Sequence, residues 1–489
     1  MKEYGSEKKP KTMTYWINTA IVLFCFFGFG LLPDFGLGYA GMRAVGIFLG
    51  LLWGWITVEF GWVSILGIIA MGTTGAMDIA TSFSTAFLST TFFQMVFPMI
   101  LLAYLGQSGF SEWIAYKMLS LKVLRGHPWR ITAMIFLTAA VLCFFVTTFP
   151  MIFLMWALFL GIAEVAGYQK GDKYVGYVMC TIVMLQTVIS GSVPWSFYSV
   201  TLHSLMANSL NGYAFPFMQV LFLGIVGELL TVVIALIIGK FILRVDVSKM
   251  KEMPEEFYEK AKTIKLSVDG KVAFGVMIAL IVLLGIPSFL PDLPISPFLS
   301  GLGLHGVSAL LLGVLLLLRK KDGTPFTKTD KLAQVGLTWD IVLLVTSTLS
   351  LSALMQTEQV AIIPKVTGFL IPIVSQMSPV AFIVVTLVLF WLVTQVTHNF
   401  VIVLTLVGAL AGVCAGMGIN PWVFGWLFMC GMSFAYCTPA ASSPGALMYA
   451  HEWINKKDAY INGILFSAVG MVIFMVVMIP LAFMVFGTI

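Results

Sequence analysis

Residues 392–400, LVTQVTHNF, and residues 434–444, FAYCTPAASSP, decide how this sequence folds. Each stretch interrupts an otherwise apolar run with polar residues or prolines. Lipid offers the backbone no hydrogen-bond partners, so irregular backbone at membrane depth is tolerated only where protein buries it or a water-filled cavity meets it. The first half of the chain carries fainter counterparts, VTTFP at 146–150 and SGSVPW at 190–195. Interrupted segments at matching positions of two halves are the best sequence indication of a transporter's binding site.

Composition places the chain in a membrane. Of the 489 residues, 60% are hydrophobic and only 10% are charged, and the mean hydropathy is +1.00. A soluble domain has about 25% charged residues. The basic residues fall in short loops, which gives no indication of nucleic-acid binding. The six cysteines stand singly, without the spacing of a metal site or a disulfide framework. We therefore expect an all-α polytopic membrane protein.

Apolar length and loop charge predict the crossings. A helix needs roughly 20 apolar residues to span a bilayer, and loops rich in Lys and Arg stay in the cytoplasm. Residues 1–12 are lysine-rich and are expected to form a cytoplasmic tail, and 111–123 an amphipathic helix at the interface. The predicted continuous spans are 13–32, 43–59, 60–74, 91–107, 215–243, 271–290, 303–318, 337–355 and 462–486.

Two further segments predict re-entrant hairpins and two predict broken helices. The run 131–162 is too long for one span and has basic flanks at both ends, so both ends are expected in the cytoplasm; two short full spans are the alternative. The run 379–415 lacks Lys and Arg at its flanks, which indicates the outer face. Segments 174–207 and 422–449 are each expected to cross once, with a break in the middle.

The resulting topology is self-consistent. It has eleven transmembrane helices and two hairpins that enter from opposite sides, which makes an inverted repeat. The N-terminus is cytoplasmic, the C-terminus is outside, and the loop 244–271 is cytoplasmic. We expect a multi-pass protein of the cell (inner) membrane.

A broken helix exposes two helix ends at mid-membrane. The N-terminal end carries roughly half a positive charge and free N–H groups, which suit an anion, whereas the C-terminal end and unwound carbonyls suit a cation. Hydroxyl and amide side chains add donors without burying a full charge, although each residue has the alternative role of capping its own helix. The residues of this kind are Thr147, Thr148, Ser190, Ser192, Thr397, Asn399, Thr438, Ser442 and Ser443.

Two titratable residues are candidates for carrying a coupled proton. His398 lies at the second hairpin tip, where it can donate to an anionic substrate or titrate; simple hydrogen bonding is its alternative role. Glu228 lies deep in the span 215–243, and such residues are functional candidates by default. A helix–helix contact is the alternative for Glu228. Cys437 lies inside the second break, where its thiol is a candidate to line the cavity.

The residues of the breaks resemble those of the divalent-anion/sodium symporter family, the INDY-type dicarboxylate and citrate carriers. CTPAA at 437–441 is similar to the family's Ala-Thr-Pro-Pro-Asn loop in the second broken helix. Residues 396–400 fall where the second hairpin tip of the family carries Ser-Asn-Thr. Residues 147–149 fall at the first Ser-Asn-Thr, and 191–194 at a Gly-Thr-Pro-Pro-like loop. The resemblance covers most of the chain.

The resemblance implies a secondary active transporter of a small organic anion, a homodimer that works by an elevator mechanism without a cofactor. Residues 13–123 and 272–377 would form the scaffold, and 124–243 and 378–489 the moving transport domain. It implies substrate contacts from Thr147, Thr148, Phe149, Pro194, His398, Asn399, Phe400, Thr438 and Pro439. It implies a Na⁺ site, with no other metal, among Thr147, Ser190, Gly191, Ser192, Thr397, Asn399, Cys437 and Ala440.

The chain also departs from the family's motifs. His398 replaces a serine, Phe149 and Phe400 replace both threonines, and Ala440 stands in place of the second proline. These changes predict a more apolar site, and a substrate that is not an ordinary C4-dicarboxylate or that has one carboxylate and an apolar part. Coupling to Na⁺, coupling to protons through His398, and exchange all stay open.

Other function classes fit the sequence less well. A cation/proton antiporter or an inorganic-anion exporter of the same superfamily would need an acidic residue at the tips. A membrane-embedded enzyme would need paired acids, a metal cluster or a Ser/His/Asp set in one layer; a receptor is the other alternative outside transport. No GxxxxGK[ST] loop is present for ATP binding. We therefore expect a carrier and not an enzyme.

Overall fold

Helices make up the chain's regular structure. The computed structural model describes residues 13–33, 36–146, 148–190, 193–209, 216–250, 255–337, 339–360, 376–395, 398–439 and 441–487. None of these residues lies in a β-strand, which confirms the predicted all-α class. The chain divides into two compact units. Unit 1 is Met1–Phe92 with Thr338–Leu370, and unit 2 is Phe93–Leu337 with Ile371–Ile489.

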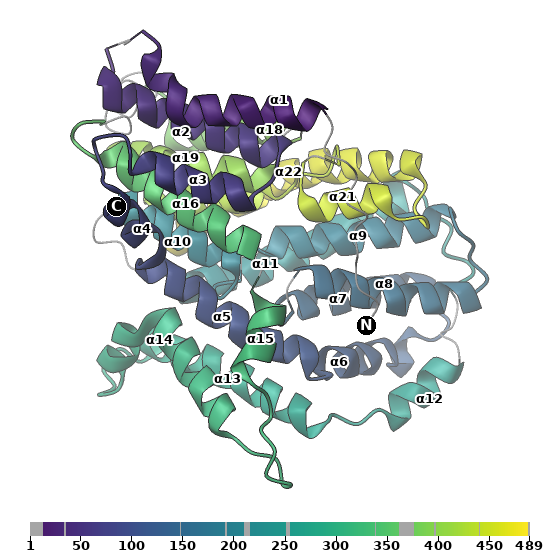
Figure 1. The fold of residues 1–489 in the computed structure, drawn as a ribbon. Helices are drawn as coiled ribbons and strands as arrows, with labels where there is room; N and C mark the ends of the chain where they lie inside the picture. The colour runs from purple at the N-terminus through teal and green to yellow at the C-terminus, as the bar shows by residue number, and fades with distance from the viewer. Residues whose placement is uncertain are drawn as a thin grey trace. The chain divides into compact units, whose positions relative to one another are not determined.

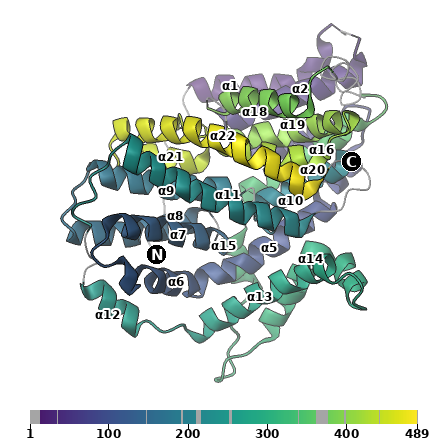
Figure 2. The same ribbon diagram turned by 180° about the vertical axis from the view of Figure 1, so that it is seen from behind.

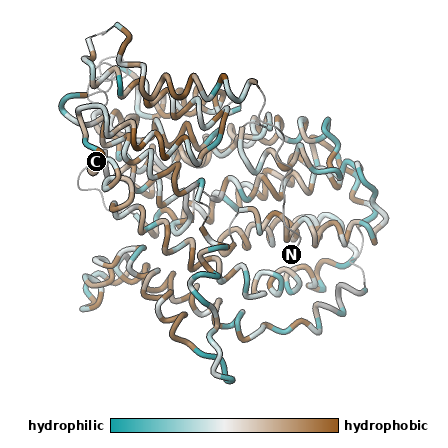
Figure 3. Tube along the Cα trace, viewed as in Figure 1, coloured by the Kyte–Doolittle hydropathy of each residue, from teal (hydrophilic) through white to brown (hydrophobic). Residues whose placement is uncertain are grey.

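The described residues confirm a polytopic membrane protein. Figure 3 shows hydrophobic residues along the long helices and hydrophilic residues concentrated at the connecting loops. The eleven crossings and the orientation remain predictions. Nine helical stretches in this part of the chain are long and apolar enough to cross a membrane: Met13–Leu31, Gly38–Thr57, Ile79–Gln107, Thr148–Val165, Phe217–Ile242, Val268–Pro287, Ser296–Leu317, Asn399–Gly416 and Lys456–Phe486.

Unit 1 is organised around a hydroxyl-rich helix near residue 350. Its helices are α1 (Met13–Leu23), η1 (Phe24–Gly28), η2 (Phe29–Leu31), α2 (Gly38–Thr57), α3 (Gly61–Met71), α4 (Ile79–Phe87) and α16 (Trp339–Gln356). Helix α16 packs against α2, α3 and α4, and the hydroxyl of Ser350 donates to the carbonyl of Ser82. The sequence did not predict α4, because its Ser and Thr residues interrupt the apolar pattern.

Arg43 is a buried cation within unit 1, where it is 5% exposed. Its Nη2 donates to the carbonyl of Phe26 at 3.1 Å and to Thr73 Oγ1 at 2.9 Å, and its Nη1 donates to Tyr39 Oη at 3.0 Å. These bonds join α2 to η1 and to the turn after α3. Because a guanidinium presents several donors in one plane, it satisfies groups that would otherwise be buried without partners.

Unit 2 contains the predicted repeat. The first copy comprises α7 (Pro128–Cys143), α8 (Thr148–Val165), α9 (Lys173–Ser190), α10 (Phe197–Ser209) and α11 (Phe217–Ile237). The second comprises α18 (Pro379–Thr394), α19 (Asn399–Gly416), α20 (Pro421–Met432), α21 (Ser443–Ala450) and α22 (Lys456–Phe486). In each copy the hairpin arms have 16 and then 18 residues. A helix of 16 residues rises about 24 Å, which is short for a hydrocarbon core of ~30 Å and supports hairpins that turn back.

The remaining helices of unit 2 correct the sequence analysis in three places. They are α5 (Thr90–Gln107), α6 (Phe110–Leu119), η3 (Lys122–Leu124), η4 (Ile238–Ile242), α12 (Glu255–Thr263), α13 (Val268–Phe289), α14 (Ser296–Leu317) and α15 (Thr329–Gly336). The predicted loop 244–271 contains α12, and α15 was not predicted; both are short, charged helices without an apolar run. Helix α14 starts earlier than the predicted span 303–318 and continues through Gly303, which has a non-helical φ of 56°.

Helix α9 is the centre of unit 2. It runs between α7 and α8 on one side and α21 and α22 on the other (Figures 1 and 2), and it also packs against α11 and α20. Every residue from 174 to 188 is buried. Elements of both repeat copies therefore enclose the helix that leads into the first break. The predicted scaffold and transport parts are defined by motion rather than compactness, so that division remains a prediction.

Replacement of Arg43 by lysine should destabilise the protein. One ammonium group cannot serve all the acceptors that the guanidinium serves, and each buried hydrogen bond to a charged group contributes about 1.5–3 kcal/mol. We expect the detergent-solubilised variant to unfold at a lower temperature than the wild type. Size-exclusion chromatography after heating measures the fraction that stays folded. Arg130→Lys is the matched control, because Arg130 is exposed. Equal unfolding temperatures for the two variants would contradict the role of Arg43.

Candidate functional site

The predicted substrate residues lie at equivalent places in the two hairpins. Thr148 and Phe149 are the first residues of α8, and Asn399 and Phe400 are the first residues of α19. Both pairs therefore stand at the N-terminal end of a second hairpin arm, where the helix dipole is positive. The other predicted residues Thr147, Gly191, Ser192, Thr397 and Ala440 lie outside the described residues, as does the side chain of Ser190.

At the first tip, Gln186 of α9 orients the hydroxyl of Thr148. Its Nε2 donates to Thr148 Oγ1 at 3.2 Å, so the hydroxyl proton of Thr148 is left to bind something else. Gln186 is 3% exposed, and its Oε1 is buried without a hydrogen-bond partner among the described residues. A buried acceptor of this kind calls for a donor or a cation. The side chain of the next residue, Phe149, is 38% exposed.

The first hairpin tip has backbone donors without an acceptor among the described residues. The N–H groups of Thr148 and Phe149 have no acceptor in the described part of the chain. The break that follows α9 is tied to this tip, because Trp195 Nε1 donates to the carbonyl of Phe144 at 2.9 Å. Pro194, predicted as a substrate contact, is buried next to Trp195.

At the second tip, the side chain of Gln395 forms hydrogen bonds with backbone groups that have no helical partner. Its Nε2 donates to the carbonyl of Trp391 at 2.8 Å and to that of Phe434 at 3.1 Å. Its Oε1 accepts from the N–H of Cys437 at 3.2 Å, and its carbonyl accepts from Thr438 Oγ1 at 2.6 Å. One residue thus holds the hairpin tip against the second break.

Two more bonds bring the predicted residues of the second half together. The N–H of Asn399 donates to the carbonyl of Ala441 at 2.9 Å, and His398 Nε2 is hydrogen-bonded to Ser443 Oγ at 2.8 Å. The N–H of Phe400 donates to Asn399 Oδ1 at 2.8 Å. At the second tip, unlike the first, the first backbone N–H groups of the helix therefore already donate to acceptors within the protein.

Each of three backbone carbonyls in the second break accepts a hydrogen bond from a side chain. Those of Phe434, Ala435 and Tyr436 accept from Trp391 Nε1 at 3.0 Å, Ser442 Oγ at 2.9 Å and Tyr449 Oη at 2.6 Å. Ser442 also caps α21 through the N–H of Gly445 at 3.1 Å. Of the hydroxyl residues named from the sequence, Ser442 thus has the capping role.

The two halves meet at the breaks. Tyr436 Oη donates to the carbonyl of Met184 in α9 at 2.9 Å. The ring of Phe400 packs edge to face on Tyr198 of α10, with centroids 4.7 Å apart, and is itself buried. The ring that replaces the second threonine is therefore occupied by a protein contact, whereas Phe149 is open.

Four residues of this site were not predicted: Gln186, Trp391, Gln395 and Tyr436. Gln395 and Tyr436 stand inside the stretches that decide the fold, and a glutamine in an apolar run is a signal that was available for both Gln186 and Gln395. Their partners lie far away in sequence, so spacing alone does not show what they bind.

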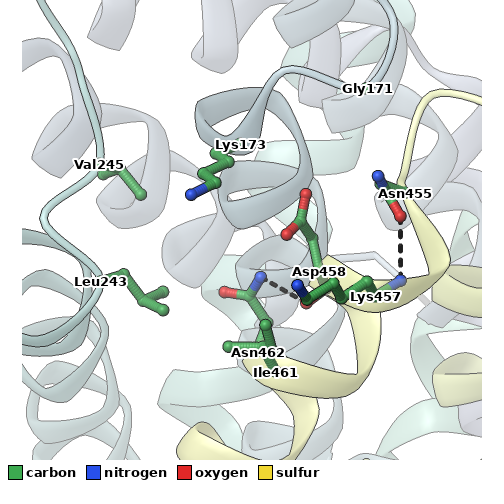
Figure 4. Close-up of a pocket in the computed structure, with 9 residues that line it drawn as sticks. All are labelled: Gly171, Lys173, Leu243, Val245, Asn455, Lys457, Asp458, Ile461 and Asn462. Carbon is green, nitrogen blue, oxygen red and sulfur yellow. Dashed lines mark hydrogen bonds between the residues drawn. The ribbon is translucent and has the colours of Figure 1, made fainter.

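A separate cavity of about 370 Å³ lies at the opposite end of α9. Figure 4 shows Lys173 pointing into it from α9, with Asp458 and Asn462 from α22 and Leu243 on the other side. None of the predicted site residues lines it. Nor do the described residues contain a cluster of three His, Cys, Asp or Glu that would hold a metal ion.

Next to this cavity, the two repeat copies are joined by polar contacts. Lys170 Nζ pairs with Glu452 Oε2 at 2.7 Å, and the N–H of Gly171 donates to the carbonyl of Trp453 at 3.2 Å. The hydrogen bond from Lys170 holds the pKa of the Glu452 carboxyl below its usual value. The copies therefore touch at both ends of α9.

Replacement of Gly463 by alanine should disturb the second break. A Cβ atom at Gly463 of α22 would overlap the carbonyl of Tyr436, which is backbone and cannot rotate away. We expect a lower unfolding temperature and a loss of transport in proteoliposomes. The control is Gly412→Ala in α19, where a Cβ meets nothing within 4 Å and should raise stability by up to about 1 kcal/mol. Normal transport by Gly463→Ala would show that the break tolerates displacement.

The sequence matches the model of a known protein family. Residues 48–431, most of the chain, match the model of the CitMHS family, described as citrate transporter. No curated protein matches the chain. The family match spans both hairpins and the start of the second broken helix, and it confirms the kind of carrier that the resemblance implied. The chain belongs to the CitMHS citrate transporter family and is a membrane carrier, not an enzyme.

Proposed function

We propose that this protein carries citrate, or a closely related carboxylate, across the cell membrane as a secondary active transporter. The observation that carries the proposal is the open N-terminus of α8, in a chain whose family is described as citrate transporter. Here the Thr148 hydroxyl and two N–H groups, which have no acceptor among the residues that the structure describes, lie at the positive end of a helix dipole. This is the chemistry that binds a carboxylate.

The second tip contributes different groups to the proposed site. Its first N–H groups are used within the chain, but the amide Nδ2 of Asn399 has no partner among the described residues and stays available to the anion. The hydroxyl proton of Thr438 is given to Gln395, so only its oxygen lone pairs are left. Thr438 therefore suits a cation better than an anion.

The coupling cation is proposed to sit near the first break. The orphan Oε1 of Gln186 lies one turn before Ser190 on α9, and Ser190, Gly191 and Ser192 were named from the sequence as a Na⁺ site. Carbonyl, amide and hydroxyl oxygens are the ligands that hard cations prefer. These neutral oxygens suit Na⁺, whereas a coupled proton would need a titratable side chain at another place.

The apolar side of the proposed site is Phe149. Phe149 follows Thr148 in α8 and its ring is 38% exposed, whereas Phe400 is packed on Tyr198. Citrate is a branched six-carbon tricarboxylate, so it fits the expectation of a substrate other than an ordinary C4-dicarboxylate. We further propose the elevator motion, the homodimer and the cytoplasmic N-terminus that the resemblance implied.

The experiment that tests this function is a thermal-shift screen of the purified protein, followed by uptake into proteoliposomes. Citrate should raise the unfolding temperature more than succinate does, because a ligand that binds the folded state stabilises it by mass action. Both assays are run with and without Na⁺. If citrate neither stabilises the protein nor enters the vesicles while another solute does, the proposed substrate is wrong.

Replacement of Thr148 by valine should weaken citrate binding. The change removes a hydroxyl donor to a charged group, which contributes about 1.5–3 kcal/mol, so KM should rise roughly tenfold or more. Uptake of labelled citrate at several concentrations measures the effect. Thr405→Val is the matched control, since Thr405 Oγ1 bonds only to its own helix α19. An unchanged KM for Thr148→Val would remove Thr148 from the site.

A further inference from the structure

Glu228 is a buried acid that the proposed substrate site does not use. It lies in α11 and is 2% exposed. Both carboxyl oxygens are buried, and neither has a hydrogen-bond partner in the part of the chain that the structure describes. Burying an ionised carboxylate without a hydrogen-bond partner or counter-ion has a large free-energy cost. The carboxyl of Glu228 is therefore held in its neutral form.

Among the described residues, the groups around Glu228 supply no counter-ion. The carboxyl lies near the thiol of Cys143, at the end of α7, and near the phenol of Tyr436, in the second break. From α9, Tyr177 Oη donates to the carbonyl of Ala235, two turns along α11. The charged residues of the elements packed against α11 stand at helix ends, away from Glu228: Arg130, Lys173, Lys240, Asp269, Lys271, Lys456, Lys457 and Asp458.

The position of Glu228 connects it to both halves of the site. Cys143 is followed directly by the first hairpin tip, and Tyr436 joins the second break to α9 through the carbonyl of Met184. The elevator motion proposed above would carry the first tip, the second break and Glu228 together toward water at the other face of the membrane. Water would then reach the carboxyl, which is the condition for releasing its proton.

We propose that Glu228, and not His398, binds and releases the proton that accompanies the anion. The inference rests on the proposed function with a proton, and not Na⁺ near the first break, as its coupling ion, and it concerns which residue carries that proton. Glu228 holds one proton in the packed state described here and loses it to water when the site opens on the other side. His398 is instead bonded to Ser443 at the tip, where a change of charge would alter substrate binding itself.

The test separates proton coupling from anion carriage. Wild type, Glu228→Gln and Glu228→Asp are reconstituted in Na⁺-free proteoliposomes, and two fluxes are measured: citrate exchange without a pH gradient, and citrate accumulation driven by a pH gradient. One pH unit drives roughly tenfold accumulation for each coupled proton. We expect Glu228→Gln to keep exchange but to lose accumulation and the accompanying proton flux, and Glu228→Asp to recover part of both.

Glu164→Gln is the matched control, because Glu164 is an exposed acid of α8; it should behave as wild type. Accumulation by Glu228→Gln at the wild-type level would overturn the inference. A wild type that exchanges citrate but ignores a pH gradient would also overturn it and leave the proposed function intact. A wild type that exchanges no carboxylate at all would instead refute the proposed function.

A second measurement covers the case in which Glu228→Gln does not fold. Dicyclohexylcarbodiimide is an apolar reagent that modifies neutral carboxyl groups buried in membranes. Mass spectrometry of the wild-type protein should find Glu228 modified, faster at low pH than at high pH, with loss of proton-driven accumulation. An unmodified Glu228, or a rate that does not depend on pH, would overturn the inference.

Discussion

The structure depends on one constraint: backbone groups freed by a helix break in an apolar interior must find partners within the protein. At the second break these partners are side chains from other elements, Gln395 and Trp391 from the hairpin and Tyr449 from the next half-helix. The same contacts hold the hairpin tip in place. The hydrogen bonds that satisfy the freed backbone groups are therefore the same ones that assemble the candidate binding site.

The two tips occupy equivalent positions but offer different chemistry. The first N–H groups of the arm that begins at Thr148 have no acceptor within the described part of the chain, whereas the arm that begins at Asn399 bonds to Ala441 and to its own side chain. A repeat that is symmetric in its helices is thus asymmetric in its donors. In the proposed site, the first half would attract the anion and the second would hold the hairpin tip and the break in place.

The broken helices and hairpins could be predicted from the sequence because polar residues and prolines inside apolar runs are rare and costly in lipid. The repeat and the places of Thr148, Asn399 and Thr438 followed from the same signal. The roles of Gln186 and Gln395 did not, because each depends on which distant segment the side chain meets. Short helices such as α4, α12 and α15 were missed because they lack the apolar length that a span requires.

The burial of α9 by both copies has a consequence for biosynthesis. The hydrogen bond from Tyr436 to Met184 joins residues 252 positions apart, and α20, α21 and α22 cover a face that the first copy leaves bare. A ribosome must add all of these residues before α9 is enclosed. Until then the helix bundle of the nascent chain is incomplete in the bilayer. The first half can therefore reach its final packing only after the second half has been synthesised.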